Sequence, residues 1–188
     1  DSYNGVAIIA RQPFVETSFM NWSGKSDCRH IWVRTQEGLG LHNFYVPAGG
    51  DIPDIDENSK FAHKLQFIAE MTTHFGVNKP QSEILVGDLN IAPLASDVWS
   101  SKQLLNIVSH TPLETDALKR LISDGGWHDA VRSYFGDEPK LYSWWSYRAR
   151  DWAASNRGRR LDHMWVSHDL ADRVSMAEIH RDMRGAEK

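Results

Sequence analysis

Short apolar runs recur along the chain, and they are rich in β-branched or aromatic residues. Runs of this kind are typical of β-strands that pack on at least one face. They predict strands at residues 5–10, 31–35, 40–46, 84–86, 141–145 and 161–166. The first of these runs is almost entirely apolar, so we expect it to form a buried strand.

One longer stretch between these runs has apolar residues at helical spacing. Phe61, Leu65 and Ile68 fall on one stripe, which predicts a helix from about residue 57 to residue 75. Gly76 follows this stretch as a stop signal.

A second helix is announced by its capping residues. Thr111 is a good N-cap, Pro112 suits the first turn, and Glu114 completes a capping box. We expect this helix to end near Gly125. Helices interspersed among mostly apolar strands favour a layered α/β fold with a mixed sheet over a strict repeat of β-α-β units.

The composition is that of a globular chain. Of 188 residues, 41% are hydrophobic and 24% are charged, which excludes disorder and favours a single domain over residues 1–188. The longest uninterrupted apolar run, residues 6–10, is far shorter than the roughly 20 residues that cross a bilayer. We therefore expect no membrane partner and, because Cys28 is the single cysteine, no internal disulfide.

The charge is unevenly distributed. The net charge of −4 argues against a nucleic-acid partner, but residues 140–160 carry +5 while the rest of the chain carries −9. This basic aromatic window also holds Trp144, Trp145 and Trp152. Arginine binds phosphate through a rigid fork of donors, and aromatic rings stack on or wedge between bases, so the window suits nucleic acid. The alternative is that the tryptophans are core residues and the arginines a solvated face; for Trp144 and Trp145 we expect one ring inside and one facing a groove.

A pair of polar residues follows the predicted strand at 84–86. Asp88 and Asn90 lie two apart in an extended segment, so their side chains are expected on the same side. Gly87 allows another group to approach the backbone closely. A carboxylate beside a carboxamide can orient a water, bind a phosphate or complete the oxygen shell of a hard metal. The alternative is an Asx turn that closes the strand.

Two further side chains sit at strand ends. Tyr45 ends the strand at 40–46, where it either points its hydroxyl into a cleft or packs at the sheet edge. Asp162 begins the strand at 161–166, an unusual place for a carboxylate without a partner. Its neighbour His163 should face the opposite side and is a poor candidate for a proton relay with it. The scattered histidines and single cysteine do not predict a zinc site.

Several stretches match one family when they are taken in order: residues 3–8, 44–47, 60–65, 86–93, 126–130, 142–148 and 156–162. Together they resemble the exodeoxyribonuclease III family of class II apurinic/apyrimidinic (AP) endonucleases, within the endonuclease/exonuclease/phosphatase superfamily. The bacterial repair branch fits better than the phosphatase, sphingomyelinase or deoxyribonuclease I relatives, because of the Tyr-Ser-Trp-Trp sequence at 142–145 and the Asn-Arg-Gly sequence at 156–158.

The resemblance implies a fold and an activity. The fold would be a four-layer α/β sandwich with two mixed β-sheets flanked by helices. The activity would be Mg²⁺-dependent (or Mn²⁺-dependent) hydrolysis of DNA phosphodiesters, 5′ to abasic sites and in the 3′-to-5′ direction from 3′ ends. The implied partner is double-stranded DNA with an abasic site or a 3′ end, and the implied protein is a monomer in the bacterial cytoplasm, associated with the nucleoid.

The resemblance also implies roles for individual residues. Tyr45 would contact the scissile phosphate, and Asp88 would position or deprotonate the attacking water. Asn90 would hold Asp88 or the phosphate, and Asp162 would orient a catalytic histidine. Asp88 and Asn90 are the implied metal ligands that this sequence contains. The implied DNA-binding residues are Tyr3, Trp144, Arg148, Asn156 and Arg157.

Two parts of the family pattern fall outside this sequence. A strand with an Asn and a strand with a metal-binding Glu should precede Tyr3, and a Ser-Asp-His motif should follow residue 188; His168 and His180 lack the preceding Ser-Asp. We therefore expect a fold that is incomplete at both ends and a chain with little or no activity alone. One alternative is a non-catalytic DNA-binding remnant of the fold. The other is an enzyme for a small phosphoester, which would not need the basic aromatic window.

Overall fold

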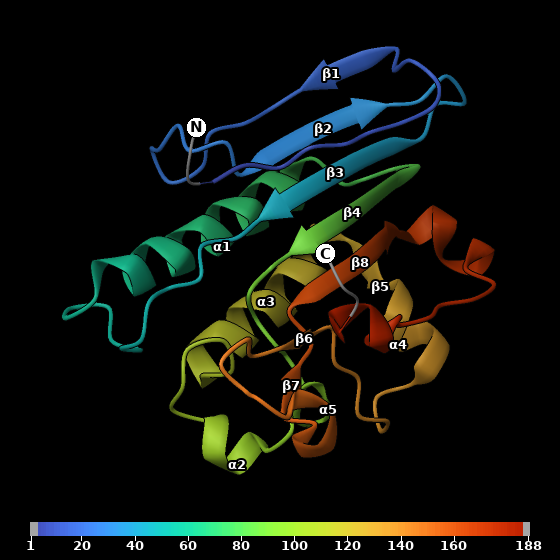
Figure 1. Ribbon diagram of the computed structural model, residues 1–188. Helices are drawn as coiled ribbons and strands as arrows, with labels where there is room; N and C mark the ends of the chain where they lie inside the picture. The colour runs from blue at the N-terminus through green and yellow to red at the C-terminus, as the bar shows by residue number, and fades with distance from the viewer. Residues whose placement is uncertain (1–3, 186–188) are drawn as a thin grey trace.

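The computed structural model describes residues 4–185, and its centre is one mixed β-sheet (Figure 1). The strand order is β1-β2-β3-β4-β8-β5, and within this sheet β3 and β4 run parallel while the other neighbouring pairs are antiparallel. The strands are β1 (Glu16–Ser18), β2 (His30–Arg34), β3 (Gly40–Tyr45), β4 (Glu83–Asp88), β5 (Trp127–Asp129) and β8 (Asp162–Ser167).

Two long helices, α1 (Ser59–Val77) and α3 (Pro112–Gly125), pack side by side on one face of this sheet (Figure 1). The shorter helices are α2 (Ser101–Leu104), α4 (Ala130–Phe135) and α5 (Trp152–Ser155), with 3₁₀ turns at Ala95–Asp97, His168–Arg173 and Arg181–Gly185. A second sheet consists of β6 (Trp144–Trp145) and β7 (Gly158–Arg159), which pair antiparallel. Within the described residues, no helix is both long and apolar enough to cross a membrane.

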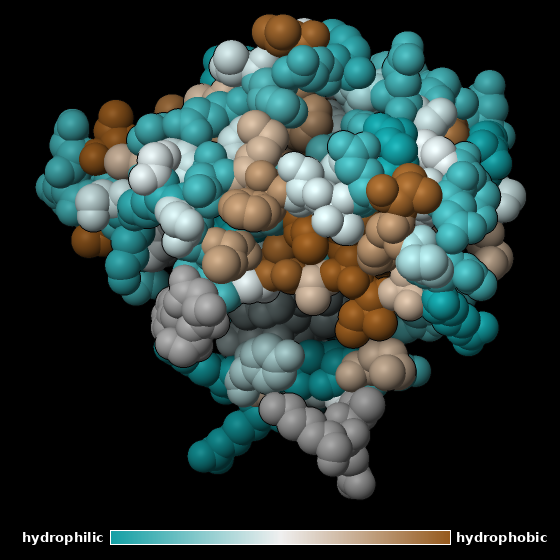
Figure 2. All heavy atoms as spheres, turned by 90° about the horizontal axis from the view of Figure 1, so that it is seen from above, coloured by the Kyte–Doolittle hydropathy of each residue, from teal (hydrophilic) through white to brown (hydrophobic). Residues whose placement is uncertain are grey.

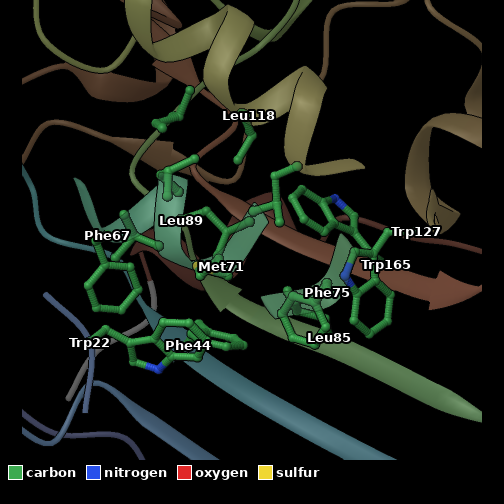
Figure 3. Packing of buried hydrophobic residues seen from close by; sticks show 14 residues of the cluster. Trp22, Phe44, Phe67, Met71, Phe75, Leu85, Leu89, Leu118, Trp127 and Trp165 are labelled. Atoms are coloured by element: carbon green, nitrogen blue, oxygen red, sulfur yellow. The ribbon is translucent and has the colours of Figure 1, made fainter. Parts of the chain in front are cut away.

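The main core fills the space between the sheet and the two long helices (Figure 3). Alternate strand residues point toward the helices, among them Phe44 of β3, Leu85 of β4 and Trp165 of β8, and each of the three is completely buried. Helix α1 contributes Phe67, Met71 and Phe75, and α3 contributes Leu118 and Leu121. This alternation places the intervening strand residues on the opposite face of the sheet.

The predicted strands in the middle of the sheet are confirmed. The runs at 31–35, 40–46, 84–86 and 161–166 form β2, β3, β4 and β8 with shifts of a few residues at most. These runs form strands because each lies between two hydrogen-bonded neighbouring strands and packs against α1 and α3.

The predicted strand at 5–10 is wrong. Its residues make no ladder with any described strand, and Ile9 is 96% exposed. An apolar run becomes a strand only where a neighbour supplies backbone partners. Here the described hydrogen bond comes from a side chain: Asn43 Nδ2 donates to the Ala7 carbonyl oxygen at 3.0 Å. The predicted strand at 141–145 shortens to Trp144 and Trp145, because its partner β7 is only two residues long.

The capping prediction for α3 is confirmed, with Thr111 and Glu114 forming a capping box and Gly126 ending the helix in a left-handed conformation. Helix α1 continues through Gly76 and ends at Val77, two residues beyond the predicted end at residue 75. Asn78 is its C-cap, and the Asn78 N–H donates to the His74 carbonyl oxygen at 2.8 Å. One glycine in an otherwise packed helix costs roughly 1 kcal/mol, which the buried stripe of α1 offsets.

The fold is mixed α/β, as predicted. In residues 4–185 the long helices cover one face of the six-stranded sheet, and the second sheet has two strands in place of a full layer. The four-layer sandwich and the single-domain assignment over 1–188 stay predictions for the whole protein.

Candidate functional site

Three of the predicted site residues form a row across the sheet. Tyr45 is the register partner of Asp88 in β4, and Asp88 is the register partner of Asp162 in β8. Side chains of residues directly opposite each other share one face of a sheet. Their chain neighbours Phe44 and His163 are buried on the side of α1 and α3, so the row lies at one end of the opposite face.

The His163 prediction is confirmed. Its ring is 4% exposed, and Nε2 lies 2.8 Å from the Ile91 carbonyl oxygen, on the other side of the strand from Asp162. Burial, together with the nearby charge of Arg160, lowers the pKa of His163 to about 4. A neutral imidazole held in this way serves packing, and it does not exchange protons with Asp162.

The electrostatics of the row favour a cation. Burial and the negative charge of Asp162 raise the pKa of Asp88 to about 6, although the hydrogen bond from the Asn90 N–H opposes this shift. Partial desolvation also raises the pKa of Asp162, although its side chain reaches the surface. A carboxylate with a pKa near 6 is ionised at neutral pH and still basic enough to accept a proton from water. Two adjacent carboxylates also match the oxygen ligands that Mg²⁺ prefers.

Asn90 supports Asp88 through its backbone. Its φ of 54° is left-handed, and its N–H donates to Asp88 Oδ1 at 2.9 Å. The expectation of an extended path over residues 88–90 is therefore wrong, and the structure has the alternative, an Asx turn. The Asn90 side-chain amide donates to the Val46 carbonyl oxygen at 2.9 Å. This bond fixes the side chain, and Oδ1 accepts no hydrogen bond from any described residue, so it remains able to contact a metal or a water.

Gly87 brings β3 and β4 close together beside the row. Its φ is 139°, and a Cβ at this position would overlap the carbonyl oxygen of Phe44. The prediction that Gly87 permits a close backbone approach is confirmed, and the group that approaches is the neighbouring strand.

A buried lysine lies beneath the loop that carries Asn90. Lys64 Nζ donates to Glu114 Oε1 at 2.5 Å, to the Asn90 carbonyl oxygen at 2.8 Å and to the Ala48 carbonyl oxygen at 3.2 Å. Both charged side chains are fully buried. Burial lowers the pKa of Lys64, and the negative charge of Glu114 opposes that shift. All three ammonium protons are thus used to join α1, α3 and two loops of the site.

Sequence reasoning missed this role of Lys64, although a signal was present. Lys64 lies three residues after Phe61 and four before Ile68, so it falls on the same apolar stripe of α1. Arg29 was also missed, and no pattern in the sequence indicates it. Its guanidinium lies 4.8 Å from the centroid of the Tyr45 ring and donates to the Tyr45 carbonyl oxygen at 3.2 Å.

The basic aromatic window is only partly a surface feature. Trp145 is buried and Trp144 is half-buried, which confirms that one ring points inward. Arg160 is also buried, with hydrogen bonds to the carboxylates of Asp97 and Asp129. The +5 charge of residues 140–160 was wrongly taken as a charge that faces DNA, because it counts Arg160 as exposed. Arg160 is buried and neutralised by these carboxylates.

The other predicted DNA-binding residues in the window do reach the surface. Arg148, Asn156 and Arg157 are exposed. Asn156 Oδ1 accepts a hydrogen bond from Trp145 Nε1 at 3.0 Å, which anchors the loop to the buried ring. Tyr3 lies outside the described residues, so the structure does not place it.

The sheet face that carries the row is also hollowed. A cavity of about 870 Å³ lies beside Asp162 and Ser143, and its floor includes Ile84, Met164 and Val166. Seen from above, hydrophobic side chains gather in a hollow ringed by hydrophilic ones (Figure 2). The Ser143 hydroxyl accepts the backbone N–H groups of Leu161 at 3.0 Å and Asp162 at 2.9 Å, which ties the window to the start of β8.

The chemistry of the described residues accounts for part of a metal centre. Within residues 4–185, no group of three or more His, Cys, Asp or Glu side chains is arranged to hold a metal ion, and no histidine there bonds to Asp162. The candidate oxygen donors are Asp88, Asp162 and Asn90. Mg²⁺ is commonly bound by one or two carboxylates together with waters and substrate phosphates, so this donor set suits it.

The family is shown by a match between residues 1–182 and the model of the endonuclease/exonuclease/phosphatase family. The chain belongs to that family. An exodeoxyribonuclease of Bacillus subtilis is 36% identical over 106 residues, which cover 55% of this chain and 40% of that protein. Exodeoxyribonuclease III of Haemophilus influenzae is 28% identical over 197 residues, which cover 98% of this chain and 72% of that protein. The resemblance to exodeoxyribonuclease III and AP endonucleases is thereby confirmed.

Solved structures share the fold. A 3′ phosphatase from Neisseria, bound to a product DNA hairpin, superposes with a TM-score of 0.76 at 24% identity, covering 87% of this chain and 62% of that chain. An AP endonuclease from Archaeoglobus fulgidus superposes with a TM-score of 0.74 at 26% identity, covering 84% and 60%. The chain therefore spans about three-fifths of the length of these structures, and between 40% and 72% of the two exodeoxyribonucleases.

Proposed function

We propose that this chain belongs to a Mg²⁺-dependent DNA-repair nuclease that cleaves DNA 5′ to abasic sites and removes nucleotides from 3′ ends. The observation that supports this most directly is the row of Tyr45, Asp88 and Asp162. It combines a hydroxyl, a carboxylate with a raised pKa and a second carboxylate at one end of a sheet. The whole protein would be a monomeric four-layer sandwich that acts in the bacterial cytoplasm on nucleoid DNA.

The row can divide the work of hydrolysis. Asp88 orients the attacking water and accepts its proton, and the Asn90 N–H keeps the reactive oxygen of Asp88 in place. The Tyr45 hydroxyl donates to an oxygen of the scissile phosphate. Asp88 and Asn90 Oδ1 would hold Mg²⁺ (or Mn²⁺), which when bound neutralises charge that develops on the phosphate oxygens.

Asp162 needs a histidine partner for its proposed role, and His163 cannot supply it because it is bonded to Ile91 on the other face. We therefore expect little or no DNA incision by the 188-residue chain alone. Trp144 would probe the abasic gap, while Arg148, Asn156 and Arg157 would hold the backbone of the duplex. Their exposure beside a buried anchor, Trp145, suits that task.

The first experiment measures DNA binding in EDTA, by fluorescence anisotropy, with a duplex that contains one tetrahydrofuran abasic analogue. We expect binding that weakens steeply between 50 and 200 mM salt. Arg157→Ala should weaken it, and Asp88→Asn should not. Failure of the wild-type chain to bind this duplex at 50 mM salt would refute the proposal. Activity on a phosphoinositide without any DNA binding would favour the small-phosphoester alternative.

The second experiment separates the nuclease from the non-catalytic remnant. Mn²⁺ is titrated into the ¹⁵N-labelled chain, and paramagnetic broadening of the Asn90 amide resonance is followed by NMR. A metal held by Asp88 should broaden this resonance at low Mn²⁺, and Asp88→Asn should abolish the effect. Lys60→Met, a change at an exposed position of α1, is the control. Equal broadening of this resonance in the wild type and Asp88→Asn would show that Asp88 holds no metal and would favour the non-catalytic remnant.

A further inference from the structure

Residues Val98 and Trp99 pair with β7 and so extend the small sheet. Val98 forms an antiparallel bridge with Arg159, and the Trp99 N–H donates to the Gly158 carbonyl oxygen at 3.1 Å. This pairing places Trp99 beside Arg157, although the two are far apart in the sequence. Trp99 and Trp144 both pack on the small core cluster formed by Ala92, Val98, Leu104 and Leu161.

Trp99 carries the exposed Arg157 on its ring. The guanidinium carbon of Arg157 lies 4.6 Å from the Trp99 ring centroid, which is within the range of a cation–π interaction. Within residues 4–185, Arg157 forms no salt bridge and its guanidinium makes no hydrogen bond. The face of the guanidinium is thus occupied, while its N–H donors stay available at the edge.

The neighbouring pair, Arg159 and Trp144, differs because the guanidinium of Arg159 is already hydrogen-bonded inside the protein. Arg159 lies 5.8 Å from the Trp144 ring centroid, but its Nη1 donates to the Val108 carbonyl oxygen at 3.2 Å and to Ser109 Oγ at 2.7 Å. Arg159 is therefore turned into the protein, and Arg157 is the arginine of the two pairs that can reach an external phosphate.

We propose that Trp99 is a positioning residue for DNA binding, which acts by holding the Arg157 guanidinium ready to bind a backbone phosphate. This inference rests on the proposed function. Stacking on a ring leaves the planar fork of N–H donors free for a bidentate contact with phosphate. It also restricts the rotamers of a long side chain before binding, so less conformational entropy is lost when the phosphate is engaged.

A double-mutant cycle tests the coupling between the two residues. The affinity of the full chain for the abasic-analogue duplex is measured in EDTA at several salt concentrations for wild type, Trp99→Leu, Arg157→Ala and the double variant. Trp99→Leu should weaken binding by about 2- to 5-fold, the range expected for an exposed cation–π contact. Arg157→Ala should also reduce the salt slope by about one. In the Arg157→Ala background, Trp99→Leu should cause no further loss.

Two further variants keep the test specific. Trp32→Leu removes a comparable stack, in which the guanidinium of Arg34 lies 4.9 Å from the Trp32 ring at another part of the sheet, and it should leave DNA affinity unchanged. Trp99→Phe keeps an aromatic surface and should recover at least half of the lost affinity, even if Trp99→Leu disturbs folding.

The outcomes separate this inference from the function on which it rests. If the wild-type chain binds DNA but Trp99→Leu binds equally well, the positioning role is overturned and the proposed function stands. The role is also overturned if the losses of the two single variants multiply in the double variant, because Trp99 would then act independently of Arg157. If the wild-type chain does not bind DNA, both statements are refuted.

Discussion

Lys64→Met should destabilise the chain strongly. Lys64 and Glu114 form a fully buried ion pair with an N–O distance of 2.5 Å between α1 and α3. The substitution removes the positive charge but keeps most of the side-chain volume, so the main perturbation is electrostatic. It leaves the Glu114 carboxylate without its cation, and it leaves the carbonyl oxygens of Asn90 and Ala48 without their Lys64 donor.

The magnitude follows from what remains around Glu114. Removing one partner of a buried ion pair commonly costs about 3–5 kcal/mol, because the other charge stays buried. Glu114 retains three donors: the backbone N–H groups of Ser109 and Thr111, at 2.9 and 3.2 Å, and the Thr111 hydroxyl at 2.7 Å. These bonds stabilise the carboxylate, so we expect the lower end of the range, about 3 kcal/mol of unfolding free energy at pH 7.

The measurement is urea unfolding followed by circular dichroism, with the double variant Lys64→Met/Glu114→Gln alongside the single one. Replacing the charged carboxylate by a neutral amide should recover at least about 1.5 kcal/mol, because the uncompensated charge is gone. Lys60→Met, at an exposed position one helical turn earlier on α1, should stay within about 0.5 kcal/mol of wild type. A loss below about 1 kcal/mol in Lys64→Met, or no recovery in the double variant, would refute this reasoning.

Three further predictions concern the site and its surroundings. Asp88→Asn should raise the unfolding free energy at pH 8 by about 1 kcal/mol and leave it unchanged at pH 4. The reason is that the folded protein raises the pKa of Asp88 to about 6 and so disfavours its ionised form. Equal thermal shifts at both pH values would contradict this prediction. Burial lowers the pKa of His30 to about 3, so the unfolded chain takes up this proton first as the pH falls below 6.5. His30→Gln should therefore lose less stability than wild type between pH 6.5 and 4, by up to about 1.4 kcal/mol per pH unit, and parallel profiles in urea titrations would exclude this role. Gly87→Ala should lower the unfolding free energy by more than about 3 kcal/mol or prevent folding, because its Cβ would overlap the Phe44 carbonyl oxygen. The control is Gly136→Ala, at a position with a φ of 76° and open space around it, which should cost only about 1 kcal/mol when both variants are measured by urea unfolding.

The central strands could be predicted from the sequence because each of their apolar runs also finds strand partners and a buried face in the fold. β3, β4 and β8 each combine such a run with a buried neighbour on either side. The run at 5–10 has the same local character but lacks a described strand partner. Local pattern therefore predicts where a strand can form, while the presence of a partner depends on the rest of the fold.

The candidate site shows the same division. Asp88 and Asp162 were recognisable as carboxylates at strand ends, but their pairing across β4 and β8 depends on register, which spacing along one segment does not reveal. Arg160 was counted as surface charge, and only the fold brings Asp97 and Asp129 around it. Buried charge networks join segments that are distant in sequence, so composition and periodicity do not indicate which charged side chains pair with each other.

The position of β8 between β4 and β5 has a consequence for the order in which the molecule can assemble. β3 and β4 are joined through α1 and can pair once residue 88 has been made, which sets Tyr45 next to Asp88. Asp162 reaches them only after the chain has passed through α3, β5 and the small sheet, because β8 is the last strand of the described residues to be made. A nascent chain would thus carry two of the three residues of the row and no second carboxylate. The charge repulsion that adds to the effect of burial on the pKa of Asp88 would arise only once β8 has paired with β4.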